Sequence, residues 1–324
     1  MNTFGRNFRI TVFGESHGDM IGVVMDGVPE GIALSAEDFT EDLLRRKAGA
    51  RGTTPRIEGD IPTIVSGVFE GCTTGAPLTV IFRNENTHSS DYSLFMEIPR
   101  PGHSDFVAQV KHNFFNDIRG GGHFSGRMTL TLVAAGVVAK KILGEGVSIK
   151  ADITELGGSS EREKWAEIVD NALAEGDSVG GIIECTCEGV EIGLGEPMFD
   201  PIESQISHLA FSVPGIRGVE FGDGFKAAAM RGSEHNDTYI DENGTTAKNG
   251  AGGVNGGITN GNPVVFRVAV KPTSSISKVQ KTFNFLTGEM VDFSVPGRHD
   301  ACIALRCPVI IEAVAAIVLA DNIK

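Results

Sequence analysis

Two glycine-rich segments of the sequence repeat each other, and this repeat constrains the fold more than any other feature. Residues 67–77 read GVFEGCTTGAP, and residues 253–263 read GVNGGITNGNP. The residues that recur at a constant offset are Gly67, Val68, Gly71, Thr73, Gly75 and Pro77, which match Gly253, Val254, Gly257, Thr259, Gly261 and Pro263. Chance matches between glycines are the alternative, but this many identities in one register favour a duplicated structural unit.

The repeat extends beyond these two segments. The same register pairs Thr87 with Thr273 and Ser89 with Ser275, and GDMIG…DGVPEG near the start resembles GDSVG…EGVEIG at 176–193. We therefore expect a single α+β domain over residues 1–324, built from two pseudo-twofold-related halves at about 1–150 and 151–324. A ligand site is expected where the halves meet, since pockets form preferentially at such junctions.

Hydrophobic periodicity and turn residues predict several strands and helices. Ser-Ala-Glu-Asp at 35–38 and Ser-Glu-Arg-Glu at 160–163 are capping patterns that open helices. The predicted strands are 8–13, IGVVMDG, 62–69, 77–83, GGIIECTCEGV and 264–270. The predicted helices are 35–47, 160–175, an apolar helix that starts near Gly126 or Arg127, and VIIEAVAAIVLAD near the end.

The composition excludes several classes of function. With 324 residues, of which 41% are hydrophobic, the chain can bury a large core. A formal net charge of −14 argues against non-specific binding to nucleic acid or to an anionic membrane. The N-terminus lacks a signal-peptide pattern, and no apolar run reaches the length of a membrane span. We expect a cytoplasmic protein with neither nucleic-acid nor membrane partners.

The five cysteines fit a reducing compartment better than a disulfide framework. Cys185 and Cys187 lie on one face of a predicted strand, and Cys302 and Cys307 are far away in the sequence. Buried structural thiols are the favoured interpretation, and a metal site is the alternative. We therefore expect no metal.

Arginine is concentrated where the sequence predicts loops. Ten of the sixteen arginines lie in the first 127 residues, which in an acidic protein suggests a small polyanionic ligand. In the segment 100–127, RPGHSDFVAQVKHNFFNDIRGGGHFSGR, three successive glycines allow the backbone to approach a ligand closely. The start of the helix that follows would add free N–H groups beside Arg119 and Arg127, which suits an anion. A loop with solvated arginines is the alternative.

Motifs along nearly the whole chain resemble those of the chorismate synthase family, in the same order. They are FGESHG (13–18), RRKAG…TTPRIEGD (45–60), SGVFEGCTTGAPL (66–78), RPGHSD (100–105), IRGGGHFSGR (118–127), GLGEPMFD (193–200), GVEFGDGF (218–225), GSEHND (232–237), AGGVNGGITNG (251–261), KPTSSI (271–276) and GRHDAC (297–302).

The resemblance implies a fold, a reaction and partners. The fold would be an internally duplicated β-α-β sandwich-type single domain. The reaction would be the 1,4-elimination of phosphate from 5-enolpyruvylshikimate 3-phosphate, which gives chorismate and requires reduced FMN without net redox change. NADP is associated with the family, a homotetramer is expected, and the reduced FMN could come from the chain itself or from an external flavin reductase.

The resemblance also implies roles for individual residues. His103 would protonate the leaving phosphate, His17 would stabilise the reduced flavin, and Asp300 would act near the flavin N5, which accepts the substrate proton. The implied substrate-binding residues are Ser16, Arg46, Arg51, Arg100, Arg127 and Arg298. The implied cofactor-binding residues are His123, Phe124, Ser125, Pro214, Gly215, Gly256, Lys271, Pro272, Thr273, Ser274, Ser275 and Arg298.

Physical chemistry agrees with these roles. Histidine is the natural acid near neutral pH, and the hydroxyls and cation of KPTSS suit a phosphate, although such a segment alone is more often a surface turn. The remaining histidines, His88, His112, His208 and His235, are interpreted as structural or surface residues, and His299 stays undecided.

The chain departs from the commoner family pattern in several places. The usual GGGRSSARE loop is GGGHFSGRM here, Ala48 and Ala301 replace prolines, and the Arg51 loop, the segment after Gly158 and the C-terminus are shorter.

Two rival functions stay open: a flavin-dependent oxidoreductase of another phosphorylated acid, and a regulatory module that binds flavin or phosphate without turnover.

Overall fold

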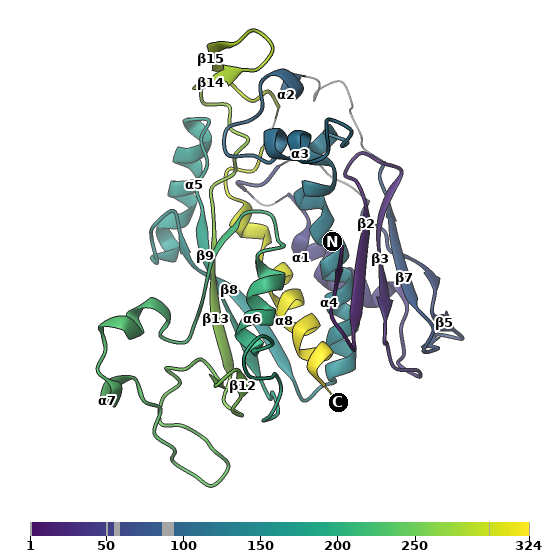
Figure 1. Ribbon diagram of the computed structural model, residues 1–324, viewed down its shortest axis with the longest axis vertical. Helices are drawn as coiled ribbons and strands as arrows, with labels where there is room; N and C mark the ends of the chain where they lie inside the picture. The colour runs from purple at the N-terminus through teal and green to yellow at the C-terminus, as the bar shows by residue number, and fades with distance from the viewer. Residues whose placement is uncertain (1, 50, 55–58, 86–93, 298, 324) are drawn as a thin grey trace.

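The computed structural model describes residues 2–49, 51–54, 59–85, 94–297 and 299–323. Its mixture of helices and strands confirms the predicted α+β class. Two antiparallel sheets lie on either side of two long helices, α4 (Thr129–Leu143) and α8 (Pro308–Asn322), which pack against each other (Figure 1). Thr87, Ser89 and Arg298 lie outside the described residues.

The first sheet comes from the N-terminal part of the chain, in the order β1-β2-β3-β7-β4. Leu78, Val80 and Phe82 alternate along its strand β7 and are fully buried, because every second side chain of a strand points to the same face. The neighbouring strand β3 packs on α4. The strand bounds are Thr3–Phe4 for β1, Arg9–Gly14 for β2, Met20–Asp26 for β3, Thr63–Ser66 for β4 and Leu78–Arg83 for β7.

The second sheet has the order β10-β13-β9-β8 and packs on α8. Cys185 and Cys187 lie two residues apart on its strand β9, and both are free and fully buried, as predicted. Burial raises the pKa of the Cys185 thiol well above its ordinary value, so the thiol is inert. The bounds are Ser148–Leu156 for β8, Gly181–Glu188 for β9, Ile216–Phe221 for β10 and Val264–Val270 for β13.

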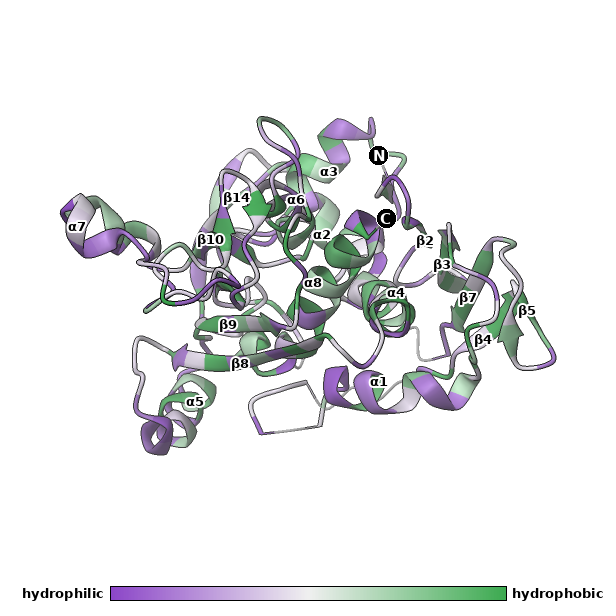
Figure 2. Ribbon diagram, turned by 90° about the horizontal axis from the view of Figure 1, so that it is seen from below, coloured by the Kyte–Doolittle hydropathy of each residue, from purple (hydrophilic) through white to green (hydrophobic). Residues whose placement is uncertain are grey.

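The two central helices approach each other closely because small residues line their contact. A Cβ added to Gly136 of α4 would lie 2.4 Å from the Cβ of Ala313 on α8. Both helices are apolar on all sides, and residues 309–321 of α8 are all buried. Helices with this pattern occupy the interior of a protein, as Figure 2 shows for α4 and α8 between the sheets.

One charged side chain, Glu312, lies inside this apolar core. Its Oε1 and Oε2 accept hydrogen bonds from Arg45 Nη2 at 2.6 Å and Nη1 at 2.7 Å. Lys140 Nζ donates to Oε2 at 3.0 Å, and the backbone N–H of Ala151 donates to Oε1 at 3.1 Å. The carboxylate therefore joins α1, α4, α8 and β8 at one point.

The shorter elements differ from the predictions mainly at their ends. The predicted helix 35–47 is a 3₁₀ turn followed by α1, and the predicted strand 62–69 breaks at Gly67 into β4 and β5. Short elements that were not predicted include α2, α3, α6 and the β14–β15 hairpin. The remaining bounds are η1 Ala36–Phe39, α1 Thr40–Arg46, β5 Val68–Phe69, β6 Cys72–Thr73, α2 Leu94–Glu97, α3 Asp105–Lys111, η3 Arg119–Phe124, η4 Gly126–Met128, η5 Arg162–Lys164, α5 Trp165–Ala174, α6 Ile202–Ala210, η6 Gly224–Ala229, α7 Gly232–His235, β11 Val254–Asn255, β12 Ile258–Thr259, β14 Gln280–Asn284, β15 Glu289–Phe293 and η7 Ile303–Arg306.

The repeated glycine-rich segments form matching hairpins. Val68 pairs with Thr73 in β5–β6, and Val254 pairs with Thr259 in β11–β12. The two threonines are buried, and each donates through Oγ1 to a backbone carbonyl, at 2.6 Å for Thr73 and 2.7 Å for Thr259. Each Oγ1 also accepts a backbone N–H at 2.9 Å. The identical residues of the repeat therefore make the same contacts in both places.

Within the described ranges, no helix combines the length and apolarity needed to span a lipid bilayer.

Glu312→Gln should lower the free energy of unfolding by about 1–3 kcal/mol, because it leaves Arg45 and Lys140 without their buried carboxylate. Burial opposes ionisation of Glu312, but hydrogen bonds and charges from Arg45 and Lys140 hold its pKa below the ordinary 4.5. The ionised carboxylate therefore stabilises the fold above pH 4.5, and this stabilisation is lost as the pH falls toward the folded-state pKa.

Thermal melts of wild type and Glu312→Gln should accordingly differ in Tm at neutral pH and converge in acid. Asp170→Asn is the control, because it removes a carboxylate whose partner Arg51 has a side chain that is 70% exposed. Equal Tm values for wild type and Glu312→Gln at pH 7 would contradict the role of the buried network.

Candidate functional site

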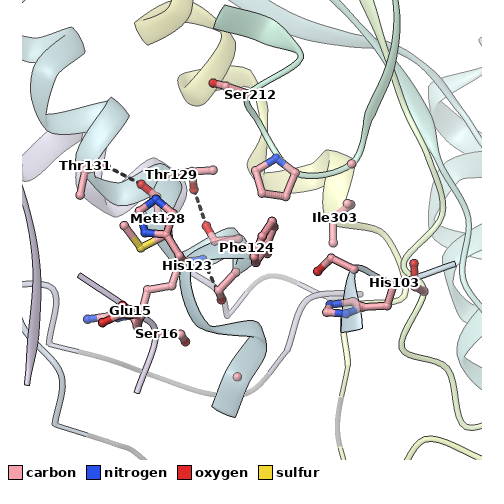
Figure 3. Close-up of a pocket in the computed structure, with 18 of the residues that line it drawn as sticks. Glu15, Ser16, His103, His123, Phe124, Met128, Thr129, Thr131, Ser212 and Ile303 are labelled. Atoms are coloured by element: carbon pink, nitrogen blue, oxygen red, sulfur yellow. Dashed lines mark hydrogen bonds between the residues drawn. The ribbon is translucent and has the colours of Figure 1, made fainter. Parts of the chain in front are cut away.

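A cavity of about 2110 Å³ opens where loops from both sequence halves meet, and Figure 3 shows part of it. Sites for a single small ligand usually measure roughly 300–1,000 Å³, so this cavity has room for more than one. Its walls include the end of β2, the segments before α3 and α4, the 271–275 segment, and residues from 296–297 and 299–306.

Most of the residues predicted from the sequence line this cavity. They are Ser16, His17, Arg46, Arg100, His103, His123, Phe124, Ser125, Arg127, Pro214, Gly215, Lys271, Pro272, Thr273, Ser274, Ser275 and Asp300. Arg51 is not among the lining residues, since its exposed side chain pairs with Asp170 at 2.5 Å. Gly256 lies in the turn of the β11–β12 hairpin, also away from the lining, and Arg298 is outside the described residues.

The triple glycine brings the two predicted catalytic histidines to the same loop. A Cβ on Gly120 would lie 2.2 Å from His17 Cε1, and a Cβ on Gly121 would lie 3.5 Å from His103 Cε1. Both glycines have positive φ, 59° and 83°, which L side chains rarely adopt. The glycines predicted to approach a ligand therefore also make room for His17 and His103.

The loop that contains the triple glycine is tied to the first sheet and to α4. His123 Nδ1 lies 2.8 Å from the carbonyl oxygen of Gly14, and the Oγ of Ser125 accepts the backbone N–H of Arg127 at 3.3 Å. Arg119, expected beside an anion, instead pairs with Asp117 at 2.7 Å and does not line the cavity. In Figure 3, Phe124 lies between His123 and His103.

Three arginines gather on one wall of the cavity, which we call the arginine wall: Arg46, Arg127 and Arg306. Arg127 Nη1 is 2.9 Å from Asp60 Oδ1, and Arg306 Nη2 donates to Asp300 Oδ2 at 2.8 Å. Burial and the charges of Arg306 and Arg127 together lower the pKa of Arg46 to about 10, although Asp60 opposes them. Three guanidinium groups face two carboxylates, so the wall keeps a positive excess that suits an anion.

Arg100 has a different environment from the arginine wall. Its Nε and Nη2 donate to the two oxygens of Asp105 at 2.7 and 2.8 Å, and Nη1 donates to Ser275 Oγ at 3.0 Å. The guanidinium also lies 4.4 Å from the centre of the Phe95 ring. Arg100 lines the cavity but is buried, and its donors are directed at protein groups.

The 271–275 segment offers a second place for an anion. Lys271 Nζ donates to the Gly102 carbonyl at 2.6 Å and to Ser274 Oγ at 2.8 Å. Burial and the nearby charge of Arg217 lower the pKa of Lys271, and a bound anion would offset both effects by stabilising the charged ammonium. Thr273 Oγ1 is buried without a hydrogen-bond partner among the described residues, as expected for a group that meets a ligand.

Asp300 is held from two sides at the edge of the arginine wall. Its Oδ1 accepts the backbone N–H of Thr54 at 2.8 Å, and its Oδ2 accepts from Arg306. The neighbouring His299 also lines the cavity, and burial lowers the pKa of its ring. In the described part of the chain, no cluster of three or more His, Cys, Asp or Glu side chains could hold a metal.

Sequence reasoning missed several lining residues. The other arginines were predicted because they lie in glycine-rich loops, whereas Arg306 and Arg217 lie outside such loops. Asp60 was identified only as the last residue of the 45–60 motif, without a role in the site. A signal for Arg306 was available, because it stands two residues before the apolar helix α8, just as Arg127 stands two residues before α4. His112 and His208, interpreted as structural or surface residues, also line the cavity.

Gly120→Ala should cost about 1–3 kcal/mol of folding free energy, since the new methyl group overlaps the His17 ring and the backbone is left-handed. Thermal melting measures the loss, and a crystal structure should show His17 displaced. Gly126→Ala, in the same loop, is the matched control, because a Cβ there meets nothing within 4 Å. A Gly120→Ala protein with the same Tm as wild type and with His17 in its original position would contradict this description of the loop.

Comparison with known proteins gives a consistent result. The chain is 63% identical over 321 residues to a chorismate synthase from Chitinophaga pinensis, covering 99% of this chain and 96% of that protein. It is 44% identical over 348 residues to a chorismate synthase from Korarchaeum cryptofilum, with coverages of 99% and 96%. A crystal structure of chorismate synthase superposes with a TM-score of 0.75 at 29% identity, over 98% of this chain and 92% of that one.

The family model described as chorismate synthase matches residues 8–323, which include every described residue of the cavity lining after Phe4. Relatives of such high identity match almost from end to end, and the motifs that suggested the family surround one cavity. The chain therefore belongs to the chorismate synthase family.

Proposed function

We propose that this cavity converts 5-enolpyruvylshikimate 3-phosphate to chorismate and phosphate, as a carbon–oxygen lyase in the last step of the shikimate pathway. The observation that carries the proposal is that His17, His103, Asp300 and the arginine wall, from four separate segments, line a single cavity. The substrate has a phosphate and two carboxylates, so its binding requires several cations in one place.

The arginine wall is the proposed binding surface for the substrate's anionic groups. Arg127 and Arg46 are buried and held by Asp60, Asn84 and Thr129, so their guanidinium groups are already oriented before the substrate enters. Preorganised cations lose little conformational entropy on binding, which strengthens both affinity and orientation. Ser16, on the cavity wall beside His17, is proposed to contact the substrate as well.

FMN is proposed as the cofactor, and the residues present fit it. Lys271, Thr273 and Ser274 would hold its phosphate, because they combine a partly buried cation with the partnerless Thr273 hydroxyl. Pro214, Gly215, Phe124 and Ser125 line the same cavity and would contact the remainder. When bound in its reduced form, the flavin supplies electron density to the substrate and recovers it, so that no net redox change results.

The chain's own groups would handle the protons. His103 would donate from Nε2 to the phosphate oxygen as its bond to carbon breaks, and His17 would stabilise the reduced cofactor. Asp300 would assist removal of the substrate proton, and its position is fixed by Thr54 and Arg306. General acid and base catalysis of this kind contributes about 10²- to 10⁴-fold to a rate.

The architecture and assembly are part of the same proposal. The matching β5–β6 and β11–β12 hairpins support an internally duplicated β-α-β sandwich, in which residues 1–324 form one domain of two related halves. Large apolar side chains on the surface, such as Phe199 and Phe225, support burial between copies in a homotetramer. We also propose a cytoplasmic location and a supply of reduced FMN either from the chain's own reductase activity or from an external flavin reductase.

The proposed reaction predicts a specific dependence on the cofactor's redox state. Under strict anaerobiosis, the protein with dithionite-reduced FMN should convert 5-enolpyruvylshikimate 3-phosphate to chorismate, measured by chorismate absorbance, and oxidised FMN should support no turnover. One reduction should support many turnovers, because substrate and product differ only by an elimination. Consumption of reductant in step with product would instead favour an oxidoreductase and exclude the proposed mechanism.

Arg127→Ala should weaken substrate binding by about 2–5 kcal/mol, because it removes a buried cation from the arginine wall. The substrate KM and Kd at a fixed salt concentration are the measurements. Arg51→Ala is the matched comparison, since it removes an arginine that the family resemblance implicates but that lies outside the cavity lining. We expect its affinity to equal that of wild type, and an equal loss in both variants would show that this cavity does not define the substrate site.

A further inference from the structure

The carboxylate of Asp105 lies between Arg100 and His103, in the first turn of α3. Asp105 Oδ2 accepts the backbone N–H of Arg100 at 3.1 Å and its Nε at 2.7 Å. Asp105 Oδ1 accepts Arg100 Nη2 at 2.8 Å and lies 2.7 Å from His103 Nδ1. All four contacts point at one carboxylate whose side chain is only 3% exposed.

This geometry determines which nitrogen of His103 carries a hydrogen toward Asp105. Arg100 Nη2 also lies 3.2 Å from His103 Nδ1, but a guanidinium can only donate. Because the contact with Asp105 Oδ1 is the shorter one, Nδ1 carries a hydrogen and donates it to the carboxylate. No described residue forms a hydrogen bond with Nε2, so this nitrogen is left to the cavity that His103 lines.

The support behind Asp105 is rigid. Arg100 is fixed by Ser275 and by the Phe95 ring in addition to Asp105, so the guanidinium cannot turn away. Burial opposes ionisation of Asp105, but hydrogen bonds from Arg100 and His103 hold its pKa well below its ordinary value. Asp105 therefore stays a carboxylate while a proton moves elsewhere.

We propose that Asp105 is a positioning residue for His103: its carboxylate holds the Nδ1–H, so that the doubly protonated ring delivers its Nε2 hydrogen to the departing phosphate and is left as the neutral Nδ1–H tautomer. The proposal rests on the proposed function. In this step the Nε2–H bond breaks, a new O–H bond forms on phosphate as its bond to carbon breaks, and Asp105 keeps its charge throughout. Arg100 accordingly supports the acid, in addition to any contact it makes with substrate.

Asp105→Asn tests the proposal because one arrangement of the amide keeps more Arg100 hydrogen bonds than the other. With the amide oxygen in the place of Oδ2, both Arg100 donors to that position are kept and only the contact with Nη2 is lost. The amide nitrogen then faces His103 and donates to Nδ1, which moves the ring hydrogen to Nε2 in the neutral ring. Because Nδ1 must then stay unprotonated, the doubly protonated ring that acts as the acid is disfavoured, so kcat should fall about 10²- to 10⁴-fold, the range for a positioned acid.

Two measurements separate positioning from a general structural role. In full-length protein with ¹⁵N-labelled histidine, the neutral form of the His103 ring, assigned by its absence in His103→Gln, should change from Nδ1–H in wild type to Nε2–H in Asp105→Asn. In a double-mutant cycle with His103→Ala, Asp105→Asn should cause no further loss of kcat, because both changes remove the same acid. Asp105→Glu, which keeps the charge, should retain the wild-type tautomer and restore part of kcat.

Glu312→Gln is the matched control, because it also neutralises a buried carboxylate paired with an arginine but does so outside the cavity lining. It should lower Tm and leave kcat unchanged. A wild-type kcat in folded Asp105→Asn, an unchanged tautomer, or independent losses in the double-mutant cycle would each overturn the proposal. Absence of chorismate formation by wild type would instead refute the proposed function, and the tautomer measurement would still report on Asp105.

Discussion

The close contact between α4 and α8 is the constraint on which the rest of the structure depends. With Gly136 against Ala313, the two helices pack at a distance that larger side chains would prevent. Two of the three arginines of the arginine wall stand just before these helices, Arg127 before α4 and Arg306 before α8. The distance between the two helices therefore influences the distance between the guanidinium groups of Arg127 and Arg306. Packing in the core thus affects the geometry of the site.

The charges near the cavity are arranged in two ways. On the arginine wall, guanidinium groups outnumber carboxylates, so part of the positive charge is left for a ligand. Around Arg100, a guanidinium and a carboxylate neutralise each other and serve to orient a histidine. An acidic protein can thus bind a polyanionic substrate, because local pairing, and not net charge, determines the field inside the cavity.

Much of the fold and part of the site could be predicted from the sequence. In strands β7 and β13 every second residue is buried, and helices α4 and α8 coincide with the apolar runs of the sequence. Such long patterns can be recognised from the sequence alone. The short elements α2, α3 and β14–β15 are stabilised by tertiary contacts and have no comparable pattern. For the same reason Asp105, Arg217 and Arg306 were missed, since their importance lies in neighbours that are distant in the sequence. The implied roles of Arg51 and Gly256 came from family resemblance alone, and the structure places neither residue on the cavity.

Helix α8 is buried in the middle of the molecule, yet it lies far along the chain from the elements that it covers. Synthesis from the N-terminus delivers the first sheet and α4 long before the residues of α8 exist. Until then the apolar faces of α4, β8 and β9 lack the helix that shields them from water. The nascent polypeptide therefore has an open interior until residues 306–322 have been made, and completion of the core coincides with completion of the arginine wall.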